Sequence, residues 1–420
     1  MSHSSVWHPF TQHALETEFP CVSRTAGAYL ETADGRRILD AISSWWVVTH
    51  QHRHPAIVEA IRSTANELDQ VIFAGFTHEP AERLAAGLAR LAPAGLDRVF
   101  FSDSGSTSVE IALKMALGFF RNRGMNRPRI AVMQHSYHGD TIGAMSIGAR
   151  GVFNAAYEPL LFDVDSIPFP APGCEQATLD RFEELARGRR LAALIIEPLV
   201  LGAGGMLMYP PSVLAELKRI AQASGTLMIV DEVMTGWGRT GTVFACEQAG
   251  ISPDILCTSK GLTGGAIPLA ATLATEEIFR AHLSQDRSRT FYHSSSYTAN
   301  PIACAAAVAN IGIWRDEPVL ARIDALSRAQ AERAARFHGD PRFADVRVCG
   351  TIAALDLRVP EGGYLAGIGP RLRAFFLAHD LLVRPLGNVI YLMPPYCITA
   401  EELDRLYDAI DAAADLVEAG

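Results

Sequence analysis

A lysine and an aspartate at the ends of two short apolar runs have the residue types that covalent chemistry on a bound ring requires. Lys260 follows the run Asp254–Cys257, and Asp231 ends the run Leu227–Val230. A lysine at the edge of a buried sheet is costly unless it is exposed, paired or neutral, and a lowered pKa is what a Schiff-base nucleophile needs. A carboxylate in such a place can pair with the protonated ring nitrogen of a pyridine cofactor.

Each of these two residues also has an ordinary interpretation. Most lysines are solvated surface groups, and Asp231 could equally be a helix cap or a metal ligand. The stretch between them leaves room for one loop and one helix joining adjacent strands, so both groups can face one pocket. The pair therefore indicates a site for a pyridine cofactor more strongly than either residue does alone.

A third polar cluster has the form of a phosphate-binding turn. Ser102-Asp103-Ser104-Gly105-Ser106 lies between the expected strand Arg98–Phe101 and an apolar helix. A glycine-containing turn that opens a helix presents free N–H groups and the positive end of the helix dipole. A simple N-cap is the alternative for this turn when it is taken alone.

An arginine and a pair of tryptophans are candidates for substrate contacts. Arg384 precedes Pro385, so it is biased to an extended conformation beside the expected strand Val389–Met393. Its guanidinium can hold a carboxylate by two hydrogen bonds, although a structural salt bridge is the default for an isolated arginine. Two adjacent indoles on a strand cannot point the same way, so either Trp45 or Trp46 is expected to face a cavity.

Three alternating histidines, at His50, His52 and His54, could mimic metal ligands on a strand. Pro55 begins a helix directly after them, and no cluster of carboxylates accompanies them. We therefore expect a surface or packing role for these histidines, and no metal site.

The elements that must position these residues follow an alternating pattern. Helices are expected from Pro55 and after Glu79, and short β-rich runs then alternate with helical stretches. This alternation predicts a mostly parallel, doubly wound α/β sheet, which binds ligands beyond the carboxyl ends of its strands. The pattern changes to helix, strand, helix around Arg347–Leu357 and Val389–Met393. We expect an N-terminal segment over 1–54, a large domain over 55–313 and a small C-terminal α+β domain over 314–420.

The bulk composition fits a folded enzyme of two domains. The chain has 420 residues, and single hydrophobic cores usually stop growing at about 250 to 300 residues. A net charge of -9 without a basic block argues against nucleic acid or an anionic membrane as a partner. The seven cysteines are scattered without a C-x-x-C pair, and neither a signal peptide nor a membrane span is evident. A cytoplasmic protein acting on small molecules is the expectation.

Several motifs taken together resemble the class III aminotransferases of fold type I over nearly the whole chain. The motifs are His8-Pro9-Phe10-Thr11, Ser43-Ser44-Trp45-Trp46, Ser136-Tyr137-His138-Gly139, Asp231-Glu232-Val233, Gly236-Trp237-Gly238-Arg239-Thr240-Gly241, Ser259-Lys260-Gly261, Arg384-Pro385 and Tyr391-Leu392-Met393-Pro394-Pro395-Tyr396. A chance match of all of these in order is not a serious option.

The resemblance implies a pyridoxal 5'-phosphate enzyme with Lys260 as the catalytic residue and covalent anchor of the cofactor. It places Asp231 at the pyridine nitrogen and Tyr137 against the ring. The phosphate is expected to contact Gly105, Ser106, Ser295 and Ser296. Because Ser296 matches a position that related dimers supply from the partner chain, a homodimer with shared active sites is implied.

The resemblance also implies two unlike small-molecule substrates, a long keto acid and an amino donor. Substrate contacts are expected from Trp45, Tyr137, Lys260, Ser294, Arg384 and Phe10, with Arg384 holding the carboxylate. The branch that matches best acts on 7-keto-8-aminopelargonic acid in biotin biosynthesis, with S-adenosyl-L-methionine as the expected donor. Lysine as donor, or an ω-amino acid or diamine as substrate, is the alternative. Two positions depart from the pattern of well-known members: Phe10 stands in place of a tyrosine, and Ser294-Ser295-Ser296-Tyr297 in place of Gly-Pro-Thr-Phe.

Overall fold

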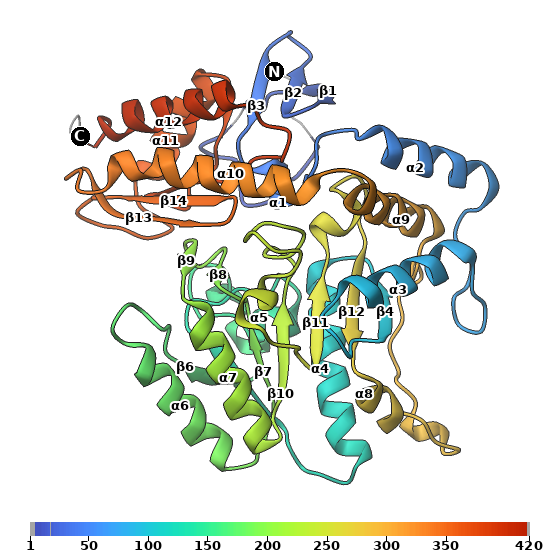
Figure 1. Ribbon diagram of the computed structural model, residues 1–420. Helices are drawn as coiled ribbons and strands as arrows, with labels where there is room; N and C mark the ends of the chain where they lie inside the picture. The colour runs from blue at the N-terminus through green and yellow to red at the C-terminus, as the bar shows by residue number, and fades with distance from the viewer. Residues whose placement is uncertain (1–4, 17, 418–420) are drawn as a thin grey trace.

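A seven-stranded sheet forms the centre of the computed structural model, which describes residues 5–16 and 18–417 (Figure 1). The strand order is β4 (Arg98–Ser102), β12 (Ala270–Ala274), β11 (Ile255–Thr258), β10 (Leu227–Asp231), β7 (Leu191–Ile196), β5 (Arg129–Met133) and β6 (Asp165–Ile167). Only β12 runs antiparallel to its two neighbours in this sheet. The predicted mostly parallel α/β sheet is confirmed.

Helices cover both faces of this sheet because its strands are apolar on both sides. Alternate residues such as Ile195 and Ile229 pack with α4 (Gly105–Asn122) on one face. Their neighbours, such as Leu194 and Met228, pack against α6 (Glu175–Arg187) and α7 (Pro211–Ser224) on the other. The shorter elements around the sheet are α5 (Ile142–Ser146), α8 (Glu276–Ala281), η1 (Ala155–Leu160), η2 (Ala245–Ala249), η3 (Lys260–Thr263), η4 (Arg287–Arg289), β8 (Val200–Leu201) and β9 (Leu207–Met208).

Two helices predicted from the sequence lie beside the sheet and pack with a third. They are α2 (Pro55–Glu67), which has proline in its first turn as expected, and α3 (Glu79–Leu91). Both pack against α9 (Pro301–Asp316) (Figure 1). Helix α9 runs without interruption through residues 313 and 314, where a domain division is expected from the sequence, so the helix itself bridges that division.

The C-terminal part forms a second layer above the sheet, together with strands from the N-terminal part (Figure 1). Strands β1 (Val22–Ala26), β2 (Tyr29–Thr32) and β3 (Arg37–Asp40) form a sheet with β15 (Leu381–Leu382), while β13 (Phe343–Cys349), β14 (Ile352–Leu357) and β16 (Val389–Leu392) form another. The covering helices are α10 (Val319–Ala334), α11 (Ile368–Ala378) and α12 (Ala400–Ala414), with η5 (Ala335–Phe337). Residues 1–4 and 17 of the expected N-terminal segment lie outside the described residues.

The strand structure expected around Arg347–Leu357 is present as the antiparallel hairpin β13–β14, because Gly350 adopts φ 57° and turns the chain. One local expectation is wrong. The tryptophan pair lies not on a strand but in a single irregular turn, α1 (Ser43–Trp46). Positive φ values at Ser43, Ser44 and Trp46 send the two indoles in different directions. The expectation that they separate holds, although its physical reason is different.

Candidate active site

The lysine and the aspartate predicted from the sequence meet at the carboxyl ends of two adjacent strands. Asp231 is the last residue of β10, and Lys260 follows β11, the parallel neighbour of β10. Both line a pocket of about 170 Å³ together with Trp46, Tyr137 and other residues of the surrounding loops. The predicted juxtaposition is confirmed.

Lys260 is held in a strained and half-buried position. It adopts φ 43°, in the left-handed region that costs a residue with a side chain about 1 to 3 kcal/mol. Its Nζ lies 4.8 Å from the centroid of the Trp46 ring, and it makes no hydrogen bond or ion pair within the described residues. Burial lowers the pKa of Lys260 to about 8, against the opposing effect of the carboxylates of Asp231 and Glu197. At a pKa of about 8, about a tenth of the amine is neutral at pH 7, which is far more than for an ordinary lysine.

Asp231 is buried and held in one orientation. One carboxylate oxygen, Oδ2, lies 2.8 Å from Nδ1 of His138, and the other accepts the N–H of Val233 at 3.1 Å. Nε2 of His138 is buried without a hydrogen-bond partner in the described residues. A buried carboxylate at the pocket wall fits a cationic ring nitrogen because burying a charge is costly unless it is paired.

Glu197, which the sequence reasoning missed, is a second buried carboxylate beside the same pocket. It directly follows β7, as Asp231 ends β10, so the rule that identified Asp231 also applies to it. Its two oxygens accept the N–H groups of Tyr137 and Gly202, both at 2.9 Å. Burial raises the pKa of Glu197 to about 7. Through these two hydrogen bonds, Glu197 connects the loop of Tyr137 with the loop of Gly202 beside the pocket.

The N-terminus of α4 also lines the pocket, as expected for a phosphate site. Gly105 and Ser106 are its first two residues and line the pocket. The first N–H groups of a helix have no partner within the helix and attract an anion. A Cβ on Gly105 would lie 2.7 Å from the Val233 side chain, so only glycine fits this close approach. The predicted N-cap also exists, because Ser104 and Thr107 form a capping box.

These features match the donor set that pyridoxal 5'-phosphate needs. The pocket offers a reactive amine at Lys260, a fixed carboxylate at Asp231 and an anion-binding helix end at Gly105. They come from three different strand ends of one sheet. Gly261 supports this arrangement, because a Cβ there would lie 2.7 Å from Trp237 and displace the turn that carries Lys260.

Three of the expected substrate residues, Phe10, Trp45 and Arg384, form a second group outside that pocket. The Arg384 guanidinium lies 4.9 Å from the centroid of the Trp45 ring, and the Phe10 ring lies 5.6 Å from that of Trp45. Nη2 of Arg384 also donates to the backbone oxygen of Phe10 at 3.4 Å. No carboxylate pairs with Arg384 within the described residues, so it is not the structural salt bridge that was the alternative from the sequence. Trp45 is 40% exposed, whereas Trp46 is buried next to Lys260.

The serine cluster is not brought to this pocket within one chain. Ser295 donates its hydroxyl to Asp103 in the turn before α4, while Ser294 and Ser296 are exposed. None of the three serines is among the residues that line the pocket with Lys260. Their predicted contacts stay predictions that require a partner chain.

The three histidines pack inside the protein. His50 lies 2.8 Å from Asn310, His52 2.9 Å from Asp40 and His54 3.1 Å from Glu317. One ring nitrogen of each histidine therefore has a side-chain partner, and the packing role expected from the sequence is confirmed. Among residues 5–16 and 18–417, no group of three or more potential ligands is placed to hold a metal ion. No helix in that part of the chain has the length and apolar character needed to cross a bilayer.

Comparison with known proteins gives a consistent result. The family model described as aminotransferase class-III matches residues 11–414. The chain is 49% identical to the adenosylmethionine-8-amino-7-oxononanoate aminotransferase of Synechococcus elongatus, over 99% of both chains. The crystal structure of the Methanocaldococcus jannaschii protein of that name superposes with a TM-score of 0.93 at 33% identity, covering 98% of this chain and 97% of that one. A PLP-bound amine transaminase from an uncultivated Pseudomonas species gives 0.92 at 31% identity, covering 99% of both chains.

Proposed function

Because the chain belongs to the class III aminotransferases, we propose that it transaminates 7-keto-8-aminopelargonic acid to 7,8-diaminopelargonic acid in biotin biosynthesis, using pyridoxal 5'-phosphate bound at Lys260. The fold-type I architecture expected from the sequence is confirmed by structures that cover nearly the whole chain. Transamination rests above all on one observation, the meeting of the Lys260 amine and the Asp231 carboxylate in one pocket. The substrate rests on the named relatives.

Each residue of the pocket has a defined task in this reaction. The cofactor, when bound, supplies an electron sink for charge that develops on the carbon next to the substrate amine. Asp231, oriented by His138, keeps the proton on the ring nitrogen. Lys260 Nζ takes and returns the proton at the reacting carbon, which its lowered pKa favours. Trp46, whose ring centroid lies 4.8 Å from Nζ, and Tyr137 line the pocket around the amine. Arg384 binds the carboxylate of the keto acid.

The lowered pKa of Lys260 predicts how cofactor capture depends on pH. Only the neutral amine binds the cofactor covalently, so the capture rate of the apoenzyme should rise about tenfold per pH unit up to about pH 8 and then level off. Stopped-flow absorbance between pH 6.5 and 10 measures this rate. An amine with an ordinary lysine pKa would instead give a rate that still rises between pH 9 and 10, and that result would contradict the account.

We also propose that the protein is a homodimer in the cytoplasm, with active sites shared between the chains. Ser294, Ser295 and Ser296 lie outside the pocket of their own chain. Exposed aromatic rings adjoin them, with Tyr292 65% and Tyr297 62% exposed, as is typical of a face that another chain covers. The seryl hydroxyls of one chain would then contact the phosphate held by the other.

The proposed donor is S-adenosyl-L-methionine, and turnover measurements test it. Purified holoenzyme is incubated with 7-keto-8-aminopelargonic acid and either S-adenosyl-L-methionine or lysine, and the diamine product is measured by mass spectrometry. We expect product with S-adenosyl-L-methionine at a rate at least about tenfold above that with lysine, which corresponds to a difference of about 1.4 kcal/mol in barrier. Turnover with lysine alone would overturn the donor and leave the transaminase assignment intact.

A further inference from the structure

Phe153 lies at the centre of an aromatic cluster that borders a cleft near the pocket of Lys260. Its ring centroid is 4.6 Å from that of Tyr364, 6.0 Å from that of Phe10 and 6.2 Å from that of Tyr137, all at steep interplanar angles. These four residues come from the N-terminal segment, two loops of the large sheet and a loop of the C-terminal layer. Edge-to-face ring pairs of this kind are favourable beyond the area that they bury.

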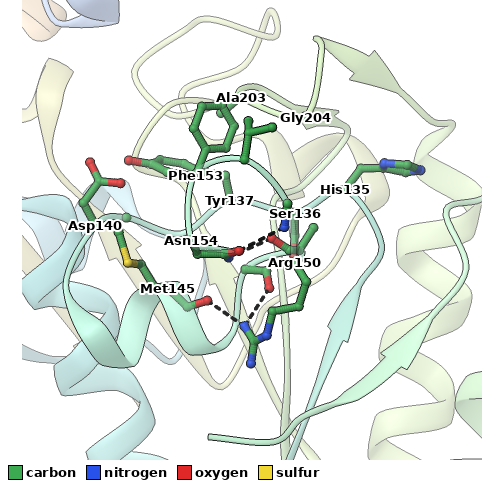
Figure 2. Close-up of a pocket in the computed structure, with 15 residues that line it drawn as sticks. His135, Ser136, Tyr137, Asp140, Met145, Arg150, Phe153, Asn154, Ala203 and Gly204 are labelled. Atoms are coloured by element: carbon green, nitrogen blue, oxygen red, sulfur yellow. Dashed lines mark hydrogen bonds between the residues drawn. The ribbon is translucent and has the colours of Figure 1, made fainter. Parts of the chain in front are cut away.

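The loop that carries Phe153 is fixed by hydrogen bonds rather than by packing alone (Figure 2). Buried Asn154 donates to the backbone oxygen of Ala149 and accepts the N–H of Gly151, both at 2.9 Å. Arg150 donates to the backbone oxygens of Met145 at 3.0 Å and Phe162 at 3.0 Å. The hydrogen bonds of Asn154 and Arg150 therefore hold the ring of Phe153 in a defined position beside the cleft.

The cluster links the two polar ends of the site. Tyr137 lines the pocket with Lys260, where the amino group reacts. Phe10 contacts Trp45, on which the Arg384 guanidinium lies. Phe153 touches both Tyr137 and Phe10, so an unbroken aromatic wall runs from the amine end to the carboxylate end. A cleft of about 600 Å³ lies beside this wall, lined by Phe10, Phe153 and Tyr364 together with apolar residues such as Ile142 and Leu365 and polar ones such as Gln12 and Asp140. It adjoins the pocket of Lys260 through the Phe153 and Tyr137 rings, whose centroids are 6.2 Å apart.

We propose that Phe153 and Tyr364 form an aromatic clamp that determines specificity by burying the methylene chain of a substrate whose amino and carboxylate groups are far apart. This inference rests on the proposed function, because a long chain between the reacting carbon and Arg384 is what the clamp covers. A buried methylene contributes binding free energy in proportion to the apolar area removed from water. A substrate without that chain gains nothing from the two rings.

The test compares a long and a short diamine in the half-reaction of the holoenzyme. The variants are Phe153→Ala and Tyr364→Ala, with Phe162→Ala as the control, because Phe162 is a partly exposed ring next to η1 that does not line the cleft. The probes are 7,8-diaminopelargonic acid and 1,2-diaminopropane, each mixed alone with the yellow enzyme. Bleaching rates give the second-order constant for each diamine, and the cofactor spectrum of each variant checks that the pocket is intact.

We expect each clamp variant to lose about 10- to 100-fold in the constant for the long diamine, mostly through weaker binding. The constant for 1,2-diaminopropane should stay within about threefold, and the control should match the wild type for both. Equal losses for the two diamines would reduce the rings to a structural role, and no loss for the long diamine would refute the clamp. A wild-type enzyme inert toward the long diamine would instead refute the proposed function, and the clamp with it.

Discussion

Replacing Lys260 by alanine is expected to lower kcat by about 10⁴-fold or more, while the fold is retained. In the proposed mechanism, the variant loses both the covalent anchor of the cofactor and the base that moves the proton at the reacting carbon. The side chain makes no hydrogen bond or ion pair within the described residues, so its removal breaks no structural contact of that kind. Steady-state transaminase activity measures the loss of catalysis in the variant, and its thermal midpoint shows whether the fold is retained.

The composition of the chain makes a direct chemical control possible. The sequence contains three lysines, Lys114, Lys218 and Lys260. Lys114 donates to a backbone oxygen at the surface and Lys218 pairs with Asp254 at 2.8 Å, so only Lys260 lines the pocket. Reduction of the holoenzyme with borohydride should attach the cofactor to the Lys260 peptide alone, and Lys114→Arg should remain active. Label on another lysine, or activity in Lys260→Ala within about tenfold of wild type, would contradict the assignment.

Asp231→Asn is expected to lower kcat by about 150- to 5000-fold, because in the proposed mechanism the amide no longer keeps the ring nitrogen protonated. Leaving a buried cation without its carboxylate costs about 3 to 5 kcal/mol, which converts to a rate loss of that size. The His138 ring, 2.8 Å from Asp231, would also lose its charged partner. The absorption band of the bound cofactor should shift in the same variant, and spectrophotometry records this independently of turnover.

Asp254→Asn is the matched control for that substitution. Asp254 pairs with Lys218 and accepts the N–H of Met228 near the start of β10, at the other edge of the sheet from Asp231. The change should lower the thermal midpoint and leave kcat within about twofold of wild type. If the two substitutions reduced kcat equally, Asp231 would be a structural residue and the cofactor role assigned to it would be wrong.

The pocket that joins Asp231, Lys260 and the start of α4 could be predicted from the sequence because it follows from sheet topology. A polar residue directly after an apolar run lies at the carboxyl edge of a parallel sheet, which places Asp231, Lys260 and the turn before Gly105 together. The same rule applies to Glu197, which could have been found in this way. The prediction therefore depended on the positions of these residues after neighbouring strands, rather than on any property of a single residue.

The outer part of the site could not be predicted in this way. Phe153 and Tyr364 lie on loops without periodicity, far apart in the sequence, and only tertiary packing brings their rings together. The turn at Ser43–Trp46 has positive φ values at residues that do not favour them, and tertiary contacts fix it. The Asp40 carboxylate accepts the N–H of Ser44 at 2.8 Å, and Ser43 donates to the backbone of Met393 at 2.7 Å. The contact between Ser43 and Met393 joins residues 350 positions apart and leaves no signal in a local sequence pattern.

The half-reaction with 7,8-diaminopelargonic acid alone tests the central claim most directly. The purified yellow enzyme is mixed with this diamine, and its absorption is followed with γ-aminobutyrate and ornithine as controls. The measurement runs the proposed reaction backward and needs no assumption about the donor. The account predicts bleaching with the diamine and none with the two controls. An enzyme that stays yellow with the diamine, or bleaches with a control instead, would contradict the biotin-pathway assignment.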